Sequence, residues 1–91
     1  MAALAKVTVL SLPAVLDLKE AAPLAARLRT VRGQPLSIDA SCVEHLGGLC
    51  LQVLLAARNT WTSDKVPIAI VSASIRFTES LALFGAALSA T

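Results

Sequence analysis

The chain has 91 residues, of which 56% are hydrophobic, 15% charged and 3% aromatic, and its formal net charge is +2. So large an apolar share offsets the ordering entropy of the chain, which excludes intrinsic disorder, and the length predicts a single domain over residues 1–91. Because its basic residues are scattered and its aromatic residues few, the composition argues against a nucleic-acid binder, which concentrates both kinds of side chain on one surface.

A mean hydropathy of +0.74 raises the question of membrane insertion. The longest uncharged apolar runs, 46–57 and 80–91, fall short of the roughly 18–20 residues that a spanning helix needs. Residues 7–16 resemble a signal peptide only weakly, because Pro13 interrupts them. The two cysteines come without a disulfide framework or a metal-ligand set. We therefore expect a reduced, cytoplasmic protein without metal or other cofactor, whose apolar surface is partly covered by a partner.

A first strand is predicted over residues 6–12, where apolar and polar side chains alternate. That period of two is typical of a half-buried strand, and we expect Val7, Val9 and Leu10 to face inward. Pro13 ends the strand.

A helix follows this strand. Asp17 and Glu20 have the spacing of a capping box, and apolar residues then recur at helical steps. Pro23 lacks the N–H that an interior helical position uses. We therefore expect a loose first turn and a regular helix from about Pro23, which ends at Gly33.

Two further helices are predicted. Gly47 and Gly48 precede an apolar helix over residues 49–61, and Ser74 is a suitable N-cap for a last helix that ends at Gly85. The first of these helices is apolar on more of its circumference than a half-buried helix needs. We expect it to pack on the sheet through Cys50, Val53, Leu54, Ala57 and Trp61, and the last helix to carry Ile75, Leu81 and Phe84.

Short apolar runs bounded by turn residues predict two more strands, at residues 36–39 and 66–72. The resulting order is strand, helix, strand, helix, strand, helix. Alternation of this kind is typical of an α/β fold in which helices pack on a largely parallel sheet. Strands near 7–10, 36–39 and 68–71 should be central or nearly so.

No pattern of catalytic residues stands out. His45 is the only histidine and Cys50 lies five residues further on, so a thiol enzyme using Cys42 or Cys50 with His45 is one hypothesis. No carboxylate beyond Asp39 and Glu44 is placed to orient the imidazole. We favour an inert, buried Cys50, an exposed Cys42 and no enzymatic activity.

A strand that ends in Asp39, a loop with apolar Val43 and Leu46, and an apolar helix after a glycine pair resemble the signature of STAS domains. This family includes the SpoIIAA-like anti-sigma factor antagonists. In it, an Asp-Ser-Ser-Gly-Leu motif opens the apolar helix. The helix positions of the family are matched by Leu51, Val53, Leu54 and Leu55, and its final strand and helix by residues 71–77 with Leu81, Leu83 and Gly85.

The resemblance implies a small mixed β-sheet with helices packed mainly on one side, and a binding face around the start of the second helix. Its motif departs from the family at the regulated serine, whose position is taken by Leu49. A leucine cannot accept phosphate, so the usual charge switch cannot operate there, and Ser41 is the nearest alternative phosphorylation site. The residues implied in partner binding are Ser41, His45, Gly47, Gly48, Leu49, Leu51 and Leu55.

Two classes of function follow from the resemblance. The first is a non-catalytic interaction module of bacterial signalling that binds an anti-sigma factor or a histidine-kinase-type ATPase, with a chemotaxis accessory protein that binds a chemotaxis histidine kinase as a variant. The second is a small-molecule module for nucleotides or lipids. Its sequence support is Gly47-Gly48, since backbone amides at a helix start can approach a phosphate. The sequence leaves the oligomeric state open, a homodimer included.

Overall fold

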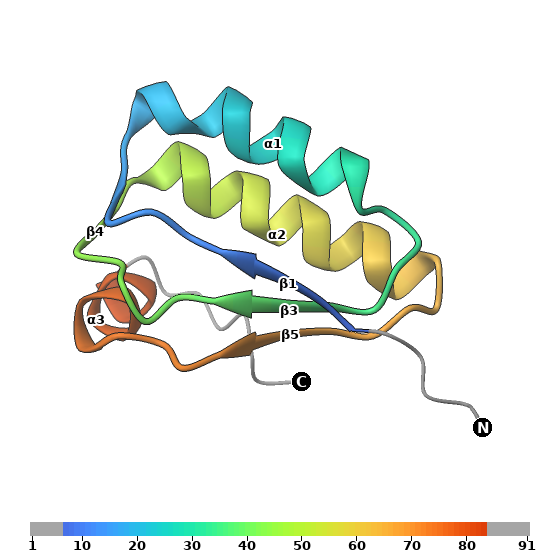
Figure 1. The fold of residues 1–91 in the computed structure, drawn as a ribbon. Coiled ribbons are helices and arrows are strands. Elements are labelled where there is room, and N and C mark those ends of the chain that lie inside the picture. Colours follow the sequence, from blue (N-terminus) through green and yellow to red (C-terminus); the bar gives the residue numbers. More distant parts are fainter. Residues whose placement is uncertain (1–6, 84–91) are drawn as a thin grey trace.

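The computed structural model describes residues 7–83. Its main sheet consists of three strands, β1 (Thr8–Ser11), β3 (Leu36–Asp39) and β5 (Ile68–Val71), in the order β1-β3-β5. The strands pair in parallel, so each connection must cross over one face of the sheet, and helices make these crossings (Figure 1). The predicted α/β fold is confirmed, with β3 between the other two strands.

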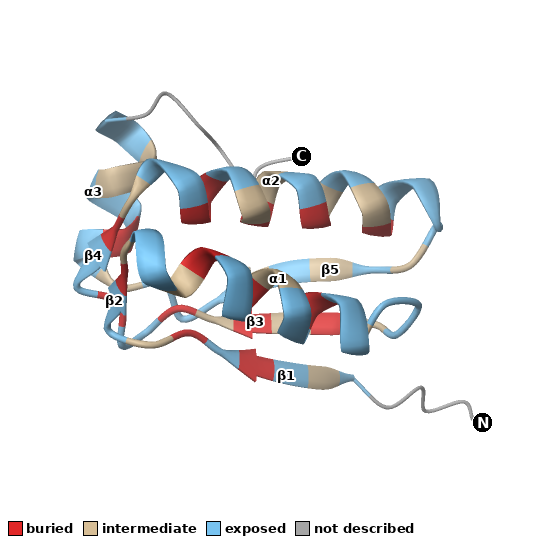
Figure 2. Cartoon of the chain, turned by 90° about the horizontal axis from the view of Figure 1, so that it is seen from above, coloured by how far each residue is buried: buried red, intermediate tan, exposed pale blue. Residues whose placement is uncertain are grey.

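Helices α1 (Ala21–Thr30) and α2 (Gly48–Ser63) lie side by side across one face of the sheet (Figure 1). Buried residues lie along one side of each helix and exposed residues along the other (Figure 2). Helix α3 (Ile75–Leu83) lies instead at the end of the sheet, beside β4 (His45–Leu46). The helices therefore pack mainly on one side, as the resemblance implied.

The core lies between this helical layer and the sheet. Leu36 and Ile38 of β3 are almost fully buried, and α1 contributes Leu24 and Leu28. The expected sheet-facing side of α2 is confirmed for four residues, while Val53 is only partly buried, at the edge that faces α1. Those four buried residues are Cys50, Leu54, Ala57 and Trp61.

The first strand has a different inward face from the one predicted. Leu10 and Leu12 are buried, whereas Val7 is 54% and Val9 64% exposed. Alternate side chains of a strand point to opposite faces, so Val9 and Leu10 cannot both face the helices. The helical layer selects Leu10, which pairs in register with the buried Ile38, and leaves the two valines on the other face of the sheet.

The turn before α1 follows the prediction in part. A short 3₁₀ segment, η1 (Leu18–Glu20), forms the loose first turn, and the Asp17 carboxylate accepts a hydrogen bond from the Lys19 N–H at 3.1 Å. The regular helix begins at Ala21 rather than at Pro23. Pro23 is tolerated there because the first four N–H groups of a helix have no helical acceptor.

Two very short strands were not predicted. β2 (Val15–Leu16) pairs in parallel with β4. The Ala14 carbonyl accepts hydrogen bonds from the N–H groups of Glu44 and His45, at 2.7 and 3.1 Å. This small ladder holds the residues after β1 against those that lead into α2, and so fixes the start of that helix.

The predicted cap of α3 is confirmed. The Ser74 hydroxyl accepts a hydrogen bond from the Phe77 N–H at 3.0 Å and donates one to the Val43 carbonyl at 2.6 Å. Ile75 is 77% exposed, and Leu81 packs partly against the core. Phe84 and Gly85 lie outside the described residues.

Replacing Ser74 by Ala should lower the free energy of unfolding by about 0.5–2 kcal/mol, because the cap of α3 and its tie to Val43 are both lost. Urea denaturation followed by circular dichroism would measure this change. Ser80→Ala on the same helix is the matched control, since it removes a hydroxyl away from the cap. Equal stability of the two variants would contradict the capping role.

Candidate functional site

The start of α2 is held closely against the chain around β2. Gly47, the N-cap, donates its N–H to the Leu16 carbonyl at 2.9 Å. A Cβ on Gly47 would lie 3.2 Å from that carbonyl oxygen and 3.8 Å from the Nε2 atom of His45. A larger residue would push the helix start away from β2. The Gly47 N–H is also already bonded, which weakens the idea that the glycine pair binds a phosphate.

The residues predicted to bind a partner differ in accessibility. Leu49 is 45% exposed and Leu55 is half-buried. Ser41, His45 and Gly48 are exposed, and Gly47 is half-buried.

Leu51 does not lie on this accessible surface, contrary to the prediction that it binds a partner. It is only 4% exposed, because it lies on the inner side of α2 with Cys50 and Leu54, and it belongs to the core. Its side chain offers no surface to a partner.

Two exposed apolar residues that sequence reasoning missed lie on segments that meet the chain near the start of α2. The Cys50 thiol donates a hydrogen bond to the Asp17 carbonyl at 3.3 Å, which brings Leu18, 75% exposed, next to the first turn of α2. Val15, 47% exposed, pairs with His45 in the short ladder that leads into the same turn. We call the exposed side chains of Val15, Leu18 and Leu49 the α2-start patch.

Asp39 and Ser41 form a tight turn at the end of β3. The Asp39 carboxylate accepts a hydrogen bond from the Ser41 N–H at 2.9 Å. Bonds from the backbone and side chain of Ser41 lower the pKa of Asp39. The ionised carboxylate thus stabilises the turn above its ordinary pKa, and this contribution is lost as the pH falls through the lowered value.

A serine far away in the sequence lies beside this turn. The Ala40 N–H donates a hydrogen bond to the Val71 carbonyl at 3.3 Å. The Ala40 carbonyl accepts a hydrogen bond from the Ser74 N–H at 3.0 Å. Ser72 lies in the sequence between Val71 and Ser74 and has a positive φ of 53°. Ser41 and Ser72 therefore stand on adjacent loops at the same end of the sheet.

The arrangement of Cys50 does not suit a thiol nucleophile paired with His45. Cys50 is buried, and its thiol bonds to the Asp17 carbonyl. Burial raises the pKa of this thiol, and the nearby charges of Asp17 and Glu20 raise it further. Cys42 is exposed, in the loop after Asp39. Cys50 thus stays protonated and inert, as predicted.

Within residues 7–83, no group of three or more His, Cys, Asp or Glu side chains is arranged to hold a metal ion. In the same part of the chain, every helix is too short or too polar to cross a lipid bilayer.

No curated protein matches the chain closely enough to count as a relative. A family model described as "Mlab, STAS domain" does match, over residues 2–87. The matched range includes every strand and helix described above, and both the α/β architecture and the apolar helix after the glycine pair agree with the expected signature. The chain therefore belongs to the STAS domain family.

Proposed function

We propose that the chain is a non-catalytic protein–protein interaction module of bacterial signalling, acting in the cytoplasm, and that its partner covers the start of α2. The proposed partner is an anti-sigma factor or another protein with a histidine-kinase-type ATPase domain. An anti-sigma partner would give the module a role in transcription regulation, and a chemotaxis kinase would make it a chemotaxis accessory protein.

The observation that carries this proposal is the exposed apolar side chain of Leu49. It occupies the position at which the resembling family presents its regulated serine, and Val15 and Leu18 extend the apolar surface around it. A group of exposed apolar side chains near one helix start commonly marks an interaction site. Burial of a fully exposed leucine contributes roughly 1.5–3 kcal/mol, and Leu49, which is 45% exposed, would contribute about half of this to binding.

A leucine at this position also bears on regulation. Phosphorylation works by adding negative charge next to an interface, and Leu49 has no hydroxyl to accept it. Binding through the α2-start patch is therefore proposed to be constitutive. Should a kinase regulate the module, the exposed Ser41 is the proposed acceptor.

Replacing Leu49 by Asp should weaken partner binding at least tenfold and leave the fold intact. The new carboxylate would have to be buried unpaired in the interface, which costs several kcal/mol. In the free protein it stays in water, in the first turn of α2, where a negative charge suits the helix dipole. The partner would first be captured from a bacterial lysate and identified as an ATPase-domain protein, then purified and titrated calorimetrically.

Asn59→Asp is the matched control, because it adds the same charge to an exposed position about 15 Å further along α2. It should bind as tightly as the native chain. Unchanged affinity of Leu49→Asp with a native circular dichroism spectrum would place the interface elsewhere. Loss of the fold would assign Leu49 to the core, and capture of no ATPase-domain protein would contradict the proposed partner.

A further inference from the structure

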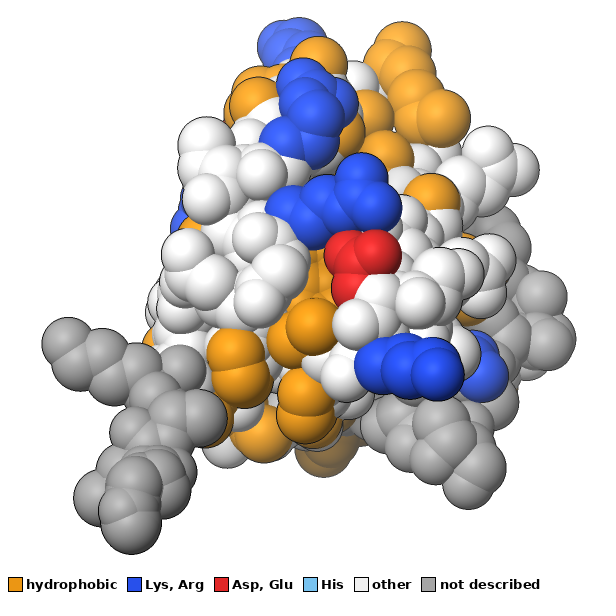
Figure 3. Space-filling model, turned by 90° about the vertical axis from the view of Figure 1, so that its right-hand side faces the viewer, with side chains coloured by type: hydrophobic (Ala, Val, Ile, Leu, Met, Phe, Trp, Pro, Cys, Tyr) orange, Lys and Arg blue, Asp and Glu red, His pale blue; other side chains and the backbone are white. Residues whose placement is uncertain are grey.

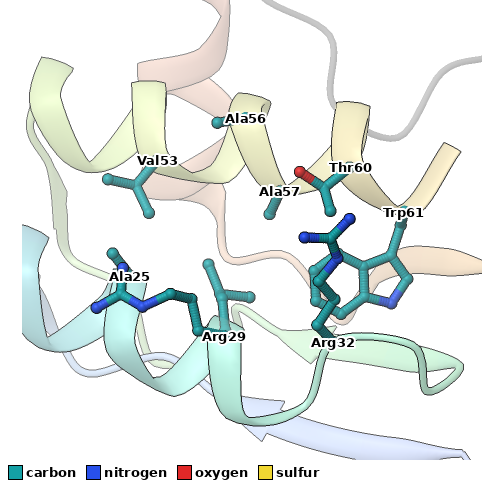
Figure 4. Close-up of a pocket in the computed structure, with 9 residues that line it drawn as sticks. Ala25, Arg29, Arg32, Val53, Ala56, Ala57, Thr60 and Trp61 are labelled. Atoms are coloured by element: carbon teal, nitrogen blue, oxygen red, sulfur yellow. The ribbon is translucent and has the colours of Figure 1, made fainter. Parts of the chain in front are cut away.

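A groove separates α1 from α2 on the side of the helices that faces away from the sheet (Figure 4). Its cavity has a volume of about 220 Å³. Small side chains on both helices leave this space open, and larger apolar ones close its floor. The small ones are Ala25, Ala56 and Ala57, and the larger ones are Leu28, Val53 and Trp61.

Two arginines stand at the rim of this groove. Arg32 reaches across toward Thr60, and Arg29 extends along α1 toward Ala25 (Figure 4). Basic side chains also gather beside hydrophobic ones at the end of the molecule where the two helices stop (Figure 3). The groove thus combines an apolar floor with a cationic rim.

Only one of the two arginines is neutralised within the described residues. Arg32 holds the Asp64 carboxylate in a fork, with Nε to Oδ2 at 3.0 Å and Nη2 to Oδ1 at 3.2 Å. This pairing raises the pKa of Arg32 and lowers that of Asp64. The Arg29 guanidinium is exposed and makes no hydrogen bond or ion pair with any residue between 7 and 83. The positive charge of Arg29, beside the apolar floor, is therefore available to an external anion.

The size of the cavity indicates what kind of ligand it takes. A protein cavity of about 150 Å³ can hold a benzene molecule, whereas sites for drug-sized ligands measure about 300–1,000 Å³. A volume of 220 Å³ therefore suits one bulky apolar side chain. The groove is partly open to solvent, so an occupant gains most when the rest of it contacts the flanking helices.

We infer that the groove between α1 and α2 is a docking site for an acidic segment of a partner protein, which inserts one bulky apolar side chain and sets a carboxylate against Arg29. Such a segment resembles an amphipathic helix laid in a groove. The charge complementarity selects an acidic partner over a basic or neutral one. This site is separate from the α2-start patch, since Arg29 lies near the opposite end of the helical layer from Leu49.

Trp61 provides the signal for a direct test, because it is the only tryptophan in the chain and it lines the groove. The probe is a blocked, alanine-based helical peptide with one central phenylalanine and glutamates three and four positions away on either side, where they share its face. It should change the Trp61 emission saturably. Peptides with lysine in place of glutamate, or alanine in place of phenylalanine, should bind at least tenfold more weakly.

Two variants test the role of the charge. Arg29→Glu should weaken binding of the acidic peptide at least tenfold, while Arg76→Glu, the same reversal on the exposed face of α3, should leave it unchanged. Both positions are exposed, so circular dichroism should show a native fold in each. The difference between the variants should shrink as salt is raised from 0.05 to about 0.5 M.

Four results would overturn the inference. The first is equal binding of the acidic and basic peptides, and the second is equal affinity of the Arg29→Glu and Arg76→Glu variants. The third is binding of 3-phenylpropionate as tight as that of the peptide, which would make the groove a small-carboxylate site instead. A peptide that leaves the Trp61 emission unchanged up to millimolar concentration would count with these.

Discussion

Replacing Leu54 by Ala should lower the free energy of unfolding by about 2–5 kcal/mol. Leu54 is 1% exposed, on the side of α2 that faces the sheet. It lines a small, partly open space of about 10 Å³ together with Ile38, Ile68 and Ile70, and so faces both β3 and β5. These strands are joined by parallel pairing and cannot move far to fill the space that the leucine leaves. The loss should therefore include a cavity cost beyond the transfer of the deleted methyl groups.

Leu55→Ala is the matched control for this prediction. It makes the same chemical change on the next residue of α2, where the side chain is only half-buried. Urea denaturation of both variants should give a clearly smaller loss for Leu55→Ala, with the same dependence on urea. Equal losses would mean that α2 is rotated about its axis relative to the structure described here.

The sequence was sufficient to predict elements whose hydrophobic period decides the packing. The buried side of α2 was expected from helical spacing, and Leu54 and Cys50 lie on it. The extents of β3 and β5 agree with the predicted strands, because short apolar runs between turn residues are typical of strands in an α/β chain. The cap at Ser74 was predicted from local chemistry alone.

Features that depend on tertiary contacts could not be predicted. β2 and β4 have two residues each, too few to show any period, so the ladder between Val15 and His45 left no trace in the sequence. Leu18 joins the α2-start patch only because that ladder brings η1 to the start of α2. The inward face of β1 also depended on which side the helices cover, and Val9 was assigned to the wrong one.

The groove between α1 and α2 also depends on tertiary contacts and could not be predicted from the sequence. Arg29 is one of several scattered basic residues in the sequence, and its isolation at an apolar groove becomes visible only when α1 and α2 are placed side by side. Leu49, by contrast, was implied in partner binding from its position in the motif, and it is 45% exposed. Motif alignment could locate a surface position, but it could not identify the neighbours that share the surface.

Replacing Phe77 by Ala should lower the free energy of unfolding by about 3–5 kcal/mol. Phe77 is fully buried and is the one buried residue of α3 within residues 75–83, so the packing of this helix depends on a single side chain. Ile75→Ala on the same helix is the control, since Ile75 is 77% exposed and should change stability by less than about 0.5 kcal/mol.

The position of α3 extends this prediction to the proposed interface. The helix packs against β4, and its cap at Ser74 holds the Val43 carbonyl in the loop before β4. In Phe77→Ala, amide hydrogen exchange should therefore accelerate first in α3 and β4, while β3 keeps the protection of the remaining core. Because β4 leads directly into Gly47 and Leu49, the variant should also bind its partner more weakly at temperatures where it is still folded. Uniform acceleration of exchange across all strands, with native affinity, would show instead that α3 belongs to one cooperative core and does not position the start of α2.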